Sequence, residues 1–184
     1  RPRVAYPSLF FLLVFDQSVG APVLELFRKR AARRKGVKLL IAHPRQVELT
    51  KYPGTYLAYR PGGEAALFHG MAQAILKNKW ADENAAKRVP NYAQLAGWLS
   101  EVTPAVVKAL AGVEQTTLEP AAQALAQAKN PLIVYGPLLT RGAAGAATLQ
   151  ALQNLAWLCG HGHRPAYAGL EGNSQGPPCT GPSP

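Results

Sequence analysis

The first 42 residues contain two continuous apolar runs separated by a segment with helical spacing. Residues 9–15 form an unbroken apolar run that stops at Asp16, and residues 37–42 form a second, mostly apolar run after Gly36. Short runs without alternation are typical of strands that are covered on both faces of a sheet. Because the segment 22–35 between them has helical character, the pattern predicts the order strand, helix, strand.

Three helices are predicted in the middle of the chain. Residues 64–77 carry apolar side chains at spacings of three and four, which predicts an amphipathic helix packed on a sheet. After an irregular stretch, residues 92–99 suggest a short helix. Thr103 and Pro104 are typical of an N-cap and a first helical position, and Gly112 is expected to end the helix that they begin.

The pattern then repeats in the order helix, strand, helix. A helix is predicted over 117–128, with Thr117 as its cap and Pro120 in its first turn. The apolar residues 132–135 predict a strand, and small residues with leucines at helical spacing predict a helix over 143–158.

Strands that are each followed by helices, without hairpin signals, predict the α/β class. The expected architecture is a Rossmann-like parallel sheet layered by helices. We assign residues 1–159 to this domain. Residues 160–184 are rich in Gly, Pro, His and Ser and lack periodicity, so we expect a tail that is held by a partner segment or forms an irregular end.

Composition restricts the class of protein. With 184 residues, 48% of them hydrophobic, the chain can bury a core, and no apolar run approaches the roughly 20 residues that cross a bilayer. We therefore expect no membrane insertion. The run 9–15 behind Arg1 and Arg3 imitates a signal peptide, but it is short for one, and Pro22 makes a poor cleavage junction. The two cysteines, Cys159 and Cys179, cannot supply a four-ligand metal or iron-sulfur site, so we expect no metal site in this segment.

The formal net charge of +10 raises the question of nucleic-acid binding. The densest group of basic residues occupies the second half of the predicted helix 22–35, where cations favour the helix dipole, and aromatic residues do not interleave with it. We expect a solvated helix end or an acidic protein partner, with salt-sensitive assembly, and no nucleic acid. The group comprises Arg28, Lys29, Arg30, Arg33, Arg34, Lys35 and Lys38.

Two polar turns follow hydrophobic elements at positions where open α/β sheets bind ligands. They are His43-Pro44-Arg45 and Arg60-Pro61-Gly62-Gly63-Glu64. A third, glycine-rich connection runs from Gly136 to Gly145, where backbone N–H groups could meet a phosphate or small residues could serve close packing. His69, at the edge of an apolar helix stripe, is expected to be structural. No catalytic triad, HExxH or paired-carboxylate motif is present, so we expect no autonomous catalytic centre.

With these residues in view, the chain resembles the molybdopterin oxidoreductase superfamily. The resemblance spans nearly the whole chain, although each motif alone is weakly specific. The matching segments, in order, are 31–41 leading to His43-Pro44-Arg45, 59–67 leading to Gly70-Met71-Ala72, 130–136, and Gly172-Asn173-Ser174-Gln175-Gly176.

In the superfamily, Asp-Pro-Arg and Arg-Pro-Gly-x-Asp turns contact the guanine nucleotide of a molybdopterin cofactor. Here His43 replaces the first Asp and Glu64 the second, and only glutamate repeats the acceptor role of a carboxylate. The resemblance thus implies a vestigial nucleotide site. Its residues are His43, Arg45, Arg60, Gly62, Glu64, Gly136, Asn173 and Gln175.

Within the superfamily, the altered turns and the final Gly-Asn-Ser-Gln-Gly are most similar to the large peripheral-arm subunits of bacterial respiratory complex I. That resemblance implies a scaffold domain without a cofactor of its own, in a subunit whose iron-sulfur clusters lie elsewhere. It also implies partner subunits of a redox complex, at the cytoplasmic side of the inner membrane. The alternatives are part of an active molybdenum enzyme that binds molybdopterin guanine dinucleotide, and a basic interaction module without a redox partner.

Overall fold

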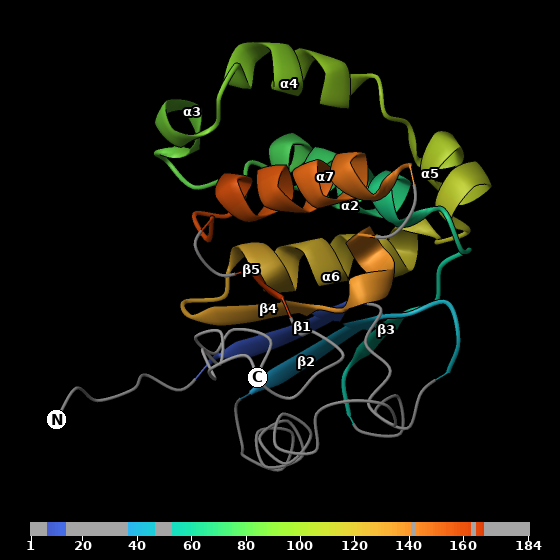
Figure 1. Cartoon of the computed structure of the whole chain (residues 1–184). Helices are drawn as coiled ribbons and strands as arrows, with labels where there is room; N and C mark the ends of the chain where they lie inside the picture. The colour runs from blue at the N-terminus through green and yellow to red at the C-terminus, as the bar shows by residue number, and fades with distance from the viewer. Residues whose placement is uncertain (1–6, 14–36, 47–52, 141–142, 163–164, 168–184) are drawn as a thin grey trace, which may run out of the picture.

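Five parallel strands form one sheet in the computed structural model, in the order β3-β2-β1-β4-β5 (Figure 1). The structure describes residues 7–13, 37–46, 53–140, 143–162 and 165–167. The strands are β1 (Leu9–Leu13), β2 (Lys38–Ala42), β3 (Thr55–Leu57), β4 (Pro131–Tyr135) and β5 (Pro165–Tyr167).

The α/β class and the parallel sheet are confirmed. β1, β2 and β4 coincide with the three predicted apolar runs, and β1 lies in the centre, paired with β2 on one side and β4 on the other. Every residue of β1 is buried, so both faces of this strand are covered. The sequence does not predict β3 or β5, and β5 lies in the segment 160–184, for which the sequence predicts a tail without regular structure.

The described helices lie on one side of this sheet, and α6 packs against β1 and β3 (Figure 1). Helices α3 and α4 form the part farthest from the sheet. The helices are α2 (Glu64–Lys77), α3 (Ala85–Arg88), α4 (Tyr92–Ser100), α5 (Pro104–Ala111), α6 (Gln115–Ala126) and α7 (Gly145–Leu158), with the short 3₁₀ helix η3 (Pro137–Thr140). The predicted helix 22–35 and its basic residues fall outside the described residues, except for Lys38.

Helix α2 has the predicted bounds but not the predicted surroundings. It packs mainly against helices α7, α6, α5 and α4, with α6 between it and the sheet. Because neighbours cover it on several sides, Gly70 and Ala72 are buried along with the apolar stripe that includes Phe68 and Met71. The sequence predicts a helix packed on a sheet, whereas the main neighbours of α2 are helices, since a single apolar stripe does not reveal whether its neighbour is a sheet or a helix.

The ends of α5 are as predicted. The Thr103 side chain accepts a hydrogen bond from the Val106 amide, Pro104 is the first helical residue, and Gly112 ends the helix with φ +74°. The start of α6 differs from the prediction. The amides of Thr117 and Leu118 donate to the Glu114 carbonyl, so the helix begins at Gln115 and Thr117 is an internal residue rather than a cap.

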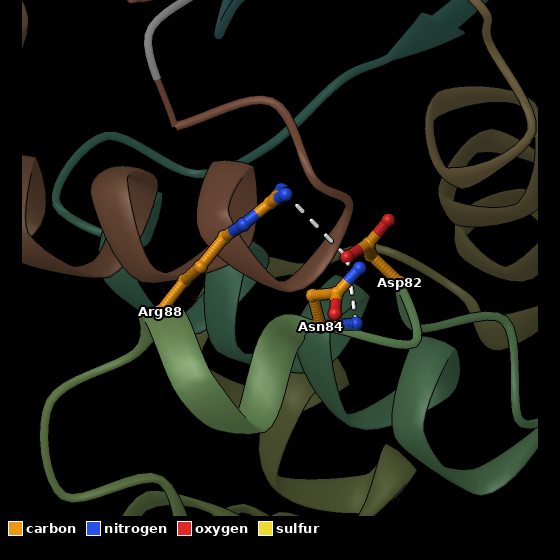
Figure 2. A network of polar contacts seen from close by, with 3 residues as sticks. All are labelled: Asp82, Asn84 and Arg88. Carbon is orange, nitrogen blue, oxygen red and sulfur yellow. Dashed lines mark hydrogen bonds and ion pairs between the residues drawn. The ribbon is translucent and has the colours of Figure 1, made fainter.

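Asp82 joins the link between α2 and α3 to the end of α7, and its carboxylate contacts Asn84 and Arg88 (Figure 2). The Asp82 amide donates to the Leu158 carbonyl at 2.8 Å, and its carboxylate accepts the Asn84 amide at 2.9 Å. Arg88 lies 3.7 Å from the same carboxylate oxygen. Gly160, with φ +76°, approaches Asp82 so closely that a Cβ there would lie 2.9 Å from its Oδ2. These contacts hold the outer helices against the central ones.

Candidate functional site

The three predicted turns lie at the carboxyl edge of the sheet. In a parallel sheet all strands end at the same edge, and His43 follows β2, the Arg60–Glu64 turn follows β3, and Gly136 follows β4. The strand order reverses between β1 and β4, where the Gly136 amide donates to the Leu13 carbonyl at 3.1 Å. The sequence thus placed these residues at the correct edge.

The first turn is closed by hydrogen bonds between its own residues. His43 is 7% exposed, and its Nδ1 lies 3.0 Å from the Arg45 amide nitrogen and 2.8 Å from the Arg45 carbonyl oxygen. The Arg45 backbone therefore occupies Nδ1 in either tautomer. Tyr56, from β3, donates its hydroxyl to the His43 carbonyl at 2.9 Å, which joins the ends of β2 and β3. Sequence reasoning missed Tyr56.

The second turn is clamped to the end of α5. The Arg60 amide donates to the Ala111 carbonyl at 2.8 Å, and its guanidinium donates to the Ala109 carbonyl at 3.0 Å. These carbonyls belong to the last turn of α5, where a cation also favours the negative end of the helix dipole. Arg60 is therefore used by the fold, in a contact with a segment 49 residues away that the sequence did not reveal.

Two glycines shape this turn for different reasons. Gly62 has φ +86°, in the left-handed region that residues with a Cβ rarely adopt. Gly63 has an ordinary backbone conformation, but a Cβ there would lie 2.7 Å from both the Ala111 Cα and the Leu110 carbonyl oxygen. The turn and the end of α5 are thus in direct backbone contact.

Glu64 is the first residue of α2 and lies half-buried at the amino end of that helix. The N-cap residue, Gly63, has no side chain to accept the first amides of α2, so a carboxylate near them is favourable. Among the described residues of the three turns, Glu64 is the one that offers a carboxylate to a ligand.

Tyr59 is the second residue that sequence reasoning missed. It is 4% exposed, and its hydroxyl has no partner in hydrogen-bonding geometry among the described residues. Burial, followed by the neighbouring Glu64 carboxylate, raises the pKa of Tyr59 far above that of an ordinary tyrosine. The site thus contains a buried phenol beside its carboxylate.

The glycine-rich connection after β4 does not form an open phosphate loop in the part that is described. Residues 137–140 form η3, and a Cβ at Gly145 would lie 2.1 Å from the Thr140 carbonyl oxygen, so this glycine serves close packing. Asn173 and Gln175 lie outside the described residues. His69 makes an edge-to-face contact with Trp98 in α4, at 4.5 Å between ring centroids, as suits a structural histidine. Burial lowers the pKa of His69.

The described residues contain no group of three or more His, Cys, Asp or Glu side chains placed to hold a metal ion. None of the described helices is long and apolar enough to span a bilayer. A cavity of about 240 Å³ lies at the opposite edge of the sheet and is lined largely by apolar residues, with Lys38 and Thr55 as its polar side chains.

Comparison with known proteins supplies the family. A family model described as molybdopterin oxidoreductase matches residues 3–176. Formate dehydrogenase H of Escherichia coli is 29% identical over 140 residues, 76% of this chain and 19% of that protein. The NADPH-Fe(3+) oxidoreductase subunit alpha of Geobacter sulfurreducens is 31% identical over 146 residues, 79% of this chain and 17% of that protein.

Two further relatives extend the range. The menaquinone reductase, molybdopterin-binding-like subunit of Nitratidesulfovibrio vulgaris is 30% identical over 151 residues, 74% of this chain and 21% of that protein. The solved structure of acetylene hydratase from Pelobacter acetylenicus superposes with a TM-score of 0.64 at 19% identity, over 85% of this chain and 22% of that one, which supports the fold. The chain spans about a fifth of the length of these relatives.

Proposed function

Because the chain belongs to the molybdopterin oxidoreductase family, we propose that it is a scaffold domain in the large subunit of a multisubunit NADH-quinone oxidoreductase. In such a complex, electrons pass from NADH to quinone and proton pumping is coupled to that transfer. The domain would stand in the peripheral arm, at the cytoplasmic side of the inner membrane, and its iron-sulfur clusters would be held elsewhere in the subunit. This segment would contribute no catalytic residue.

The observation that carries the proposal is that two ligand-type turns are used by the fold itself. The Arg45 backbone occupies the His43 Nδ1, and the Arg60 guanidinium binds the Ala109 carbonyl at the end of α5. Side chains engaged in this way stabilise the edge of the sheet without a ligand. Such contacts suit a scaffold, because a scaffold must keep its fold without a bound cofactor.

The cofactor that the family implies fits these residues only in part. A guanine base presents N–H donors, which a carboxylate accepts, and Glu64 offers one. His43 offers no carboxylate, and its Nδ1 is already engaged. The described residues therefore do not reproduce the complete acceptor set, and we assign no chemical step to a pterin or to molybdenum.

The second candidate is a domain of an active molybdenum enzyme of the formate dehydrogenase or nitrate reductase type. The observation that favours it is Glu64, which remains beside a buried phenol at the amino end of α2. Relatives named formate dehydrogenase and periplasmic nitrate reductase agree with this alternative.

Metal analysis of the purified full-length protein, combined with pterin fluorescence after oxidative release, separates the two. The scaffold predicts iron without molybdenum, no pterin fluorescence, and copurification with flavin and iron-sulfur subunits. Stoichiometric molybdenum with guanine nucleotide would overturn the scaffold and establish the second candidate. Isolation without any redox subunit would contradict both and favour a basic interaction module.

A further inference from the structure

The large apolar side chains that are exposed among the described residues all lie on two consecutive helices, α4 and α5 (Figure 1). They are Trp98 in α4 and Val106 and Leu110 in α5, which are 47%, 45% and 58% exposed. A single exposed apolar residue is ordinary, whereas a group of them on adjacent elements is typical of a contact surface. We call these three residues the outer face.

Helix α5 is apolar on its exposed side as well as on its buried side. Val107 and Ala111 are buried against the rest of the domain, while Val106 and Leu110, one turn apart, remain exposed. A helix that packs on one side only normally presents polar residues to water, and a helix that is apolar all round is normally buried. The exposed side of α5 therefore has the composition of a buried surface.

The outer face lies in a region with very little charge. Lys108 is the one charged residue within the bounds of α4 and α5, although 16% of the whole chain is charged. Its amine lies 2.6 Å from the Glu114 carboxylate, so this charge is balanced within the domain. Such a surface does not attract nucleic acid or an acidic partner, and depletion of charge is typical of the core of an interface.

The same part of α2 holds both helices. His69 makes the edge-to-face contact with Trp98, and a Cβ at the next residue, Gly70, would lie 2.8 Å from a methyl carbon of Val107. The Arg60 guanidinium also donates to a carbonyl in the last turn of α5. The outer face is thus presented by helices that are already fixed, which lowers the entropy cost of binding to it.

We propose that the outer face docks against an apolar, uncharged surface in another part of the same subunit. The chain spans about a fifth of the length of its relatives, so most of such a subunit lies outside this domain. Because that part is covalently connected to the domain, it is present at a high effective concentration beside the outer face, which a second copy or a separate subunit is not. The inference rests on this chain being a domain of a larger subunit, which both candidate functions share.

The first test is hydroxyl-radical footprinting of the unmodified full-length protein. Trp80 is the matched control, because it is a partly buried tryptophan with the same intrinsic reactivity. Without docking, Trp98 is the more exposed of the two and should be oxidised faster. We expect the reverse order, with Trp98 oxidised at least about tenfold more slowly than in the urea-unfolded protein, because reaction requires the docked surfaces to open. Oxidation of Trp98 as fast as that of Trp80, or faster, would overturn the docking.

The second test identifies what covers the outer face. The photo-reactive residue p-benzoylphenylalanine replaces Leu110 in the full-length protein, and a second variant carries it in place of Val106. We expect irradiation to produce an intramolecular cross-link to a peptide outside residues 1–184, without a change in the mass of the chain. The matched control is the same label in place of Gln150, an exposed polar residue of α7, which should cross-link much less.

The outcomes identify the occupant and keep this inference separate from the proposed function. A cross-linked dimer would indicate a second copy and a link to another polypeptide would indicate a neighbouring subunit, and either result would overturn the proposal. Equal cross-linking at Gln150 and Leu110 would also overturn it. Molybdenum in the purified protein would overturn the scaffold and leave the docking standing, whereas an exposed outer face would leave the metal content, and with it the scaffold, unaffected.

Discussion

Replacing Gly63 by alanine should separate the Arg60 turn from the end of α5. The added Cβ would lie 2.7 Å from the Ala111 Cα, 2.7 Å from the Leu110 carbonyl oxygen and 3.0 Å from the Arg60 carbonyl oxygen, whereas ordinary contacts of this kind begin near 3.4 Å. All three atoms belong to the backbone, so no side chain can rotate away. The last turn of α5 must shift by about 0.7 Å relative to the turn.

The expected cost follows from two opposing effects. Overpacking a close contact costs about 1–3 kcal/mol, and replacing glycine by alanine at an ordinary backbone conformation returns about 0.4–1 kcal/mol by restricting the unfolded chain. Because Gly63 has φ −92°, both effects apply, and we expect a net loss of about 1–2 kcal/mol. For a protein of this size, the midpoint of thermal unfolding should fall by about 2–8 °C.

Gly97, in α4, is the matched control. A Cβ there would meet no atom within 4 Å, so Gly97→Ala should raise stability by about 0.5–1 kcal/mol through helix propensity alone. Chemical and thermal denaturation of wild type and both variants in parallel provide the measurement. If Gly63→Ala proved as stable as Gly97→Ala, the backbone contact between the turn and α5 would be absent, and the clamp on which the scaffold proposal rests would be refuted.

Three further predictions concern side chains outside the turns. Burial holds the pKa of His69 below its ordinary 6.5, so the unfolded chain takes up the proton first. The free energy of unfolding should therefore be constant above about pH 6.5 and fall as the pH decreases below that value. His69→Phe should flatten this part of the stability profile, as measured by urea denaturation. Asp82→Ala should lower the free energy of unfolding by about 1 kcal/mol, because the Asp82 carboxylate accepts a hydrogen bond from a backbone amide. Arg88→Ala breaks only a partly exposed ion pair of 3.7 Å and should change the free energy of unfolding by less than about 0.5 kcal/mol. Equal losses in the two variants would contradict this assignment. Burial, followed by the Asp82 charge, raises the pKa of the Cys159 thiol to about 12. Iodoacetamide at pH 8 should therefore modify Cys159 slowly in the folded protein and quickly in urea, with the modification followed by peptide mass spectrometry. Equal rates would mean that the thiol is exposed in the folded protein.

The parts of the fold that the sequence predicted are those with strong local signals. β1 and β2 are unbroken apolar runs, and α5 has a cap, a proline and a terminal glycine at the proper positions. β3 and β5 have three residues each, which is too short to establish a period, and they become strands because β2 and β4 offer free edges. The surroundings of α2 were missed because periodicity reports that a face is buried and not what buries it.

The sequence predicted where the turns of the candidate site lie in the sheet, but not which residues they contact. Strand ends place His43, Arg60 and Gly136 at one edge, which topology alone requires. The clamp of Arg60 on α5 joins residues 49 positions apart, and the neighbours of Tyr59 depend on how that turn packs, so neither leaves a local pattern to recognise. The sequence shows a tyrosine directly before the Arg-Pro-Gly turn, but it does not show that the hydroxyl of this tyrosine is buried.

These contacts also account for the conformation of the turn without a cofactor. Arg60 closes α5, Gly62 provides a positive φ, and Gly63 permits a backbone contact, so the fold alone accounts for each of them. Their presence is therefore no indication that a nucleotide is bound. Glu64 differs, because its carboxylate lies near the buried Tyr59 phenol and contributes to the raised pKa of that phenol. A scaffold domain should keep its stability and its subunit assembly when Glu64→Gln and Tyr59→Phe are combined, whereas a nucleotide site should lose affinity for the nucleotide. This double variant therefore distinguishes the two proposed functions.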